Sequence, residues 1–86
     1  MSDVRFELNY RERATLRAVA AGRVQIICSC EPDLFIDGVA FCDQPTAHRL
    51  VHQGLMRPAV PGEPGELVAA ELTGPGMEQL GMAVPR

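Results

Sequence analysis

Asp37-Gly38 is the dipeptide that most constrains how this chain folds, because it lies between two short apolar segments. Both residues tolerate the positive φ that a two-residue hairpin turn requires. The flanking residues 34–36 and 39–42 have the apolar, partly β-branched composition of short strands. The Glu31-Pro32-Asp33 segment before them is typical of a turn. Residues 31–42 are therefore predicted to form a turn and a β-hairpin, not a helix.

The first helix is predicted to begin after Asn9 and to end at Gly22. Asn9 can cap the helix, and Glu12 follows three positions later, as in a capping box. Gly22 is a typical residue at a helix C-terminus. The apolar face is expected to contain Leu16, Val19 and Ala20, and the charged residues are expected to point mostly outward: Arg11, Glu12, Arg13 and Arg17.

A strand and a second helix are predicted on either side of the hairpin. Residues 24–30 are rich in β-branched residues and indicate a strand. Asp43 can cap a helix over residues 44–53, and Pro45 suits its first turn, where the missing N–H costs nothing. Gly54 then ends this helix.

The sequence of the C-terminal third predicts two paired strands and a last short helix. Residues 55–60 and 66–72 are the strands, and Pro58 indicates that the first lies at a sheet edge or a bulge. A loop rich in proline and glycine connects them, and Thr73 caps the helix that follows. We expect one small α+β domain over residues 1–86, with a frayed tail at 83–86.

Composition narrows the class of protein further. The formal charge is −3 and every basic residue is an arginine, which disfavours binding to nucleic acid by charge alone. No apolar run approaches the roughly 20 residues of a membrane helix, and the first residues lack the pattern of a secretory signal. The odd number of cysteines then indicates reduced thiols in a cytoplasm. The lysine-free, alanine-rich composition indicates a GC-rich genome, such as that of an actinobacterium or a phage.

Two stretches are similar to winged helix-turn-helix regulators of the MarR-like family. Ala47-His48-Arg49-Leu50-Val51-His52-Gln53-Gly54-Leu55-Met56-Arg57 resembles the end of the recognition helix and the first wing strand. Ala70-Glu71-Leu72-Thr73-Gly74-Pro75-Gly76 resembles the last wing strand and the start of the next helix. The resemblance implies a winged-helix-like domain with about three helices and a two-stranded C-terminal wing. The predicted hairpin stands where that family has the helix before the recognition helix.

If residues 44–53 form a recognition helix, the chain is a sequence-specific DNA-binding transcriptional regulator. Arginine and glutamine are the side chains that pair with guanine and adenine in the major groove. The DNA-contacting residues would then be Gln44, Thr46, His48, Arg49, Gln53 and Arg57. The tip of the expected wing carries Glu63 and Glu66 and no cation, which is unfavourable for phosphate contact.

The acidic wing and the missing helix favour a different hypothesis, a non-enzymatic regulatory or adaptor protein. It would act through contact with another protein, or with a second copy as a homodimer. Methionine suits an adaptable interface, and the interface candidates are Leu55, Met56, Met77 and Met82. Catalysis is not expected, because no glycine-rich elbow or phosphate-binding loop accompanies Cys42, Asp43 and His48.

Zinc is the only cofactor that the residue types suggest. Four of five residues could complete a tetrahedral site: Cys28, Cys30, Cys42, His48 and His52. The spacing differs from the usual Cys-x-x-Cys knuckle. The alternative is three small thiols packed between the sheet and a helix, with two surface histidines.

Overall fold

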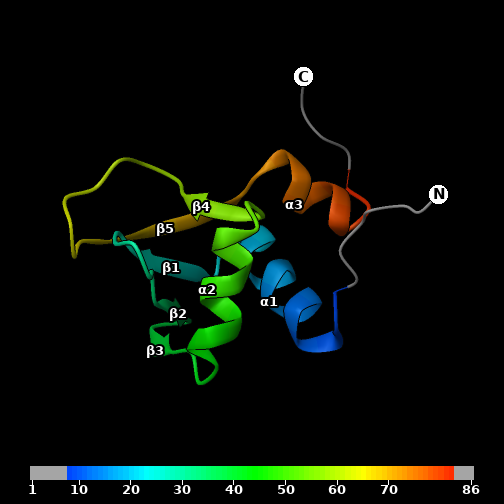
Figure 1. Cartoon of the computed structure of the whole chain (residues 1–86), viewed down its shortest axis with the longest axis horizontal. Helices are drawn as coiled ribbons and strands as arrows, with labels where there is room; N and C mark the ends of the chain where they lie inside the picture. Colours follow the sequence, from blue (N-terminus) through cyan, green and yellow to red (C-terminus); the bar gives the residue numbers. More distant parts are fainter. Residues whose placement is uncertain (1–7, 83–86) are drawn as a thin grey trace.

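The computed structural model describes residues 8–82, which form three helices and five strands (Figure 1). In chain order these are α1 (Tyr10–Ala20), β1 (Val24–Ile27), β2 (Leu34–Ile36), β3 (Val39–Ala40), α2 (Gln44–His52), β4 (Met56–Pro58), β5 (Leu67–Leu72) and α3 (Gly74–Gln79). The expected α+β class is confirmed. The predicted fraying at 83–86 lies outside the described residues.

All five strands belong to one antiparallel sheet in the order β3-β2-β1-β5-β4. β1 is the central strand, and its Ile26 lies opposite Leu34 of β2 and Val68 of β5. β3 and β4 are the edges, so Pro58 lies in an edge strand, as its missing N–H predicts. The β4–β5 loop projects from the sheet, away from α1 and α3 (Figure 1).

The helices cover one face of this sheet. Along β1, Val24 and Ile26 are buried while Gln25 between them is exposed, and β5 shows the same alternation. Leu16 of α1 and Leu50 of α2 belong to the same buried cluster as these strand residues. The domain therefore has two layers, with its core between the helices and one side of the sheet.

The predicted hairpin and helix caps are confirmed. Asp37 and Gly38 adopt positive φ values of 54° and 82° in the turn between β2 and β3. Asn9 and Glu12 form the complete capping box of α1. Asp43 and Thr73 accept backbone N–H groups at the starts of α2 and α3.

Two local predictions are wrong. The strand expected over residues 24–30 ends at Ile27, because the chain turns through residues 29–31 before β2 begins. Ala20 is exposed and Glu12 is buried, so the buried face of α1 is rotated from the expected one. The reason for this rotation is that Glu12 has an ion-pair partner on α2.

The backbone of α3 packs closely against the backbone of the turn that follows α2. A Cβ added at Gly76 would collide with the backbone carbonyl oxygen of Leu55. The Thr73 N–H donates to that same oxygen at 3.2 Å, which holds the start of α3 in place. Glycine at position 76 is therefore required by the close approach of two backbone segments.

We expect Gly76→Ala to lower the free energy of unfolding by about 1–3 kcal/mol, because the new methyl group forces two backbones apart. Glu78→Ala, an exposed change in the same helix, should stay within about 0.5 kcal/mol. Thermal and urea denaturation followed by circular dichroism measures both. A gain in stability for Gly76→Ala, as helix propensity alone would give, would contradict this packing.

Candidate functional site

Gln44, a predicted DNA contact at the start of α2, forms hydrogen bonds with the β-hairpin. Its Oε1 accepts the N–H of Leu34 at 2.9 Å. Its Nε2 donates to the carbonyl oxygens of Leu34 at 3.1 Å and Phe41 at 2.8 Å. The Phe41 N–H still donates to the Leu34 carbonyl oxygen at 3.0 Å, and the Gln44 amide bridges the Leu34 N–H and the Phe41 carbonyl oxygen. The hairpin and the start of α2 are therefore one unit.

Arg49 pairs with a buried carboxylate of α1. Its Nε and Nη2 both donate to Glu12 Oε2, at 2.9 and 2.6 Å. The Glu12 side chain is only 8% exposed, whereas that of Arg49 is 46% exposed. The Thr46 hydroxyl, also buried, donates to Asp43 at 2.6 Å and accepts from Arg49 Nη2 at 3.3 Å.

The surroundings of Glu12 favour its charged form. Burial by itself would raise the pKa of this carboxyl group. The Asn9 N–H and the Arg49 guanidinium outweigh that effect, so the pKa of Glu12 lies below its usual value of 4.5. The carboxylate accepts hydrogen bonds from the cap of α1 and from α2, and it joins the two helices.

Both histidines of α2 contact the loop between β1 and β2. His48 Nε2 lies 2.8 Å from Asp33 Oδ1, and its Nδ1 lies 3.8 Å from Glu31. His52 Nε2 lies 3.1 Å from the carbonyl oxygen of Cys30. Their spacing of one helical turn, which suggested two metal ligands, instead places both rings along this loop.

The two remaining predicted DNA contacts lie at and beyond the end of α2. Gln53 is the C-cap residue, and its side-chain Oε1 is buried with no described hydrogen-bond partner. Arg57 on β4 donates from Nε to Glu71 of β5 at 2.8 Å. Five of the six predicted DNA-contacting side chains therefore already bind groups of this chain.

The predicted zinc ligands do not come together. Cys28, Cys30 and Cys42 are all free thiols, the first half-buried and the other two exposed. Within residues 8–82, no group of three or more histidine, cysteine, aspartate or glutamate side chains is arranged to hold a metal ion. This part of the chain therefore offers no preformed site for zinc.

The four interface candidates divide into two pairs. Leu55 and Met56 are each only 1% exposed, so their prediction as surface residues is wrong. They follow the end of α2 and pack into the core cluster. Met77 of α3 is half-buried and Met82 is 42% exposed, and both line an apolar groove.

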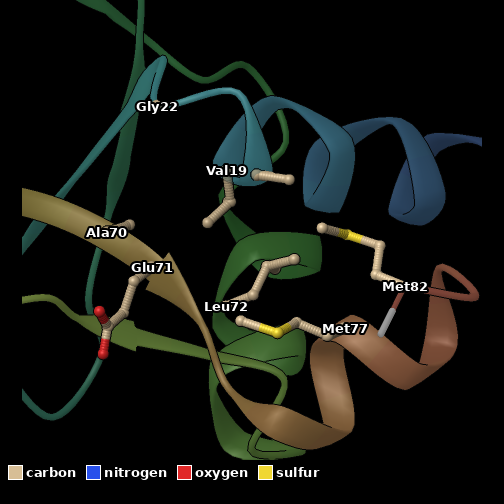
Figure 2. A pocket seen from close by; sticks show the side chains of 8 residues that line it. Val19, Gly22, Ala70, Glu71, Leu72, Met77 and Met82 are labelled. Carbon is tan, nitrogen blue, oxygen red and sulfur yellow. The ribbon is translucent and has the colours of Figure 1, made fainter. Parts of the chain in front are cut away.

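The groove has a volume of about 220 Å³ and lies between α1, β5 and α3. Its walls come mainly from Val19 and Ala20 of α1, Ala70 and Leu72 of β5, and the two methionines. Figure 2 shows Met77 and Met82 pointing toward Val19 and Leu72. The sequence indicated only the methionines, because the other walls come from elements that are distant along the chain.

No family model, curated protein or solved structure matches the chain. Among residues 8–82, no helix is long and apolar enough to cross a membrane. The function therefore has to be inferred from two features of the structure. These are the contacts that α2 makes within the domain and the apolar groove between α1, β5 and α3.

Glu12→Gln should lower the free energy of unfolding at neutral pH by about 1–3 kcal/mol, because Arg49 loses its charged partner. The stability that the carboxylate contributes is present above pH 4.5 and is lost as the pH falls through the lowered pKa of folded Glu12. The difference between wild type and Glu12→Gln should therefore shrink in acid. Urea denaturation across this range measures it.

Glu71→Gln is the control, because the Arg57–Glu71 pair is exposed and should contribute at most about 1 kcal/mol. A stability difference for Glu12→Gln that stays constant from neutral to acid pH would show that folding does not lower the pKa of Glu12, and would contradict the stabilising role of this ion pair.

Proposed function

We propose that this chain is a non-enzymatic regulatory or adaptor protein that binds another protein through the apolar groove between α1, β5 and α3. The observation that carries the proposal is the apolar lining of this groove, where half-buried Met77 and the 42% exposed Met82 lie over a buried apolar floor. Methionine side chains are flexible and adapt to the shape of a partner. A partner side chain placed there would be removed from water against Val19, Leu72 and Met77.

The size of the groove favours a side chain over a small molecule. Small-molecule sites usually measure roughly 300–1,000 Å³. A volume of about 220 Å³ is smaller than these, yet cavities of about 150 Å³ accept a benzene ring. One large aliphatic or aromatic side chain of a partner therefore fits.

The charge distribution supports a protein partner over DNA. Four of the six arginines within residues 8–82 are paired with carboxylates: Arg11 with Asp43, Arg23 with Asp37, Arg49 with Glu12, and Arg57 with Glu71. The β4–β5 loop carries Glu63 and Glu66, both exposed. Few cations are left to neutralise phosphates, which supply most of the affinity of non-specific DNA binding.

A winged-helix-like scaffold is part of this proposal. Its support is the element order, in which α2 is followed by antiparallel β4 and β5 and then by α3. The β2–β3 hairpin comes directly before α2, where a helix-turn-helix has its first helix. The presence of a hairpin instead of this first helix favours binding to a protein over binding to DNA.

Sequence-specific DNA binding by α2 is the alternative. It requires side chains such as Gln44 and Arg49 to leave the hydrogen bonds that join α2 to the hairpin and to α1. Breaking such contacts costs free energy that binding to base edges would have to offset.

Selection of a random-peptide library on the immobilised protein tests the proposal. We expect selected peptides to bind Met82→Asp at least about tenfold more weakly than wild type, equivalent to about 1.4 kcal/mol, because the charge removes an apolar wall. Val39→Asp is the matched control, since Val39 is 67% exposed on β3 and lies outside the groove. Fluorescence anisotropy measures each affinity.

A parallel selection with random DNA duplexes separates the alternatives. Peptides whose binding is unchanged by Met82→Asp would overturn the groove as the binding surface. Duplexes enriched by the wild type and lost with Arg57→Ala, which removes only an exposed ion pair, would support the DNA-binding alternative instead.

A further inference from the structure

Arg17 places a positive charge beside the groove. It is an exposed residue in the last turn of α1, three positions before Ala20, which lines the groove. Residues three apart on a helix are surface neighbours, with Cβ atoms roughly 5–6 Å apart. In the part of the chain that the structure describes, no carboxylate lies within 4.0 Å of its guanidinium.

Arg13 extends the same positive side of α1. It lies one turn before Arg17, and its Nη1 donates to the carbonyl oxygen of Gln79 at 2.9 Å. That bond ties α1 to the end of α3 and leaves the positive charge without a described carboxylate partner. The guanidinium groups of Arg13 and Arg17 therefore lie on α1, beside the wall that this helix contributes to the groove.

The carboxylates around the groove are either paired or on another wall. Glu71 contributes to the lining, but its Oε2 accepts from Arg57 Nε at 2.8 Å. Glu78 is exposed on α3, next to Met77 in the sequence. The α1 wall of the groove is thus positive, although the whole chain has a formal charge of −3.

From this arrangement we infer that the groove binds a partner segment that combines one large apolar side chain with a carboxylate. The apolar side chain enters between Leu72 and Met82, and the carboxylate, within about four positions of it, pairs with Arg17. This inference rests on the proposed function and adds the chemistry of the partner. It describes an acidic, amphipathic peptide segment of another protein.

The charge pairing is expected to control selectivity more than affinity. An exposed ion pair is screened by solvent and salt, so a carboxylate should strengthen binding by about two- to fivefold at low salt. Reversing the charge of Arg17 replaces attraction with repulsion and should select against acidic partners.

The test is a random-peptide selection on wild type, Arg17→Glu and Arg17→Gln. Wild type should enrich peptides with aspartate or glutamate within about four positions of a large apolar residue. Arg17→Glu should enrich lysine or arginine at those positions, and Arg17→Gln should show neither preference. Gln25→Glu is the control, because it changes the net charge as Arg17→Gln does, but at an exposed position of β1 outside the groove.

The outcomes separate this inference from the proposed function. Suppose that peptides selected on the wild-type protein need Met82 for binding but show no preference for acidic residues. This result would overturn the inference and leave the groove as a binding site, and so would basic peptides directed by Glu78. An acidic preference that is unchanged in Arg17→Glu would also overturn it. Peptides that do not depend on Met82 at all would overturn both proposals.

Discussion

The contact between Glu12 and Arg49 determines how the two long helices fit together. Glu12 closes the capping box of α1 through one oxygen and accepts two hydrogen bonds from Arg49 through the other. A single buried carboxylate thus completes the start of one helix and positions a second. Removing a charge from water is costly unless its hydrogen-bonding capacity is met, and here both oxygens have partners. This requirement explains why the charged side of α1 turns inward at this one position.

Several polar side chains of α2 contact other parts of the domain. Gln44 at its start continues the β-hairpin, and His48 and His52 contact the loop before β2. In this structure these side chains already have hydrogen-bond partners within the domain. The apolar groove lies between α1, β5 and α3 and includes none of these α2 side chains.

Local patterns were enough to predict much of the fold but not the site. The Asp37-Gly38 turn and the three caps depend on residues within four positions of each other, so sequence spacing reveals them. The Glu12–Arg49 pair joins residues 37 positions apart, and nothing local indicates it. Leu55 and Met56 are buried in a core cluster whose other members come from distant parts of the chain, so no local pattern indicates their burial. The methionines of the groove were identified, but not its walls on α1 and β5.

The groove is assembled from both ends of the chain, since α1 comes first in the described residues and α3 comes last. An unfolded chain cannot bring these walls together, so any molecule that occupies the groove binds only the folded form. By linkage, such a molecule shifts the folding equilibrium by RT ln(1 + [L]/Kd). A domain of this size buries roughly 60–65% of the surface that its unfolded chain exposes, less than a larger domain buries, and has little stability in reserve. The amount of folded protein in a cell would then follow the concentration of its partner, and degradation would remove the chains that remain unbound.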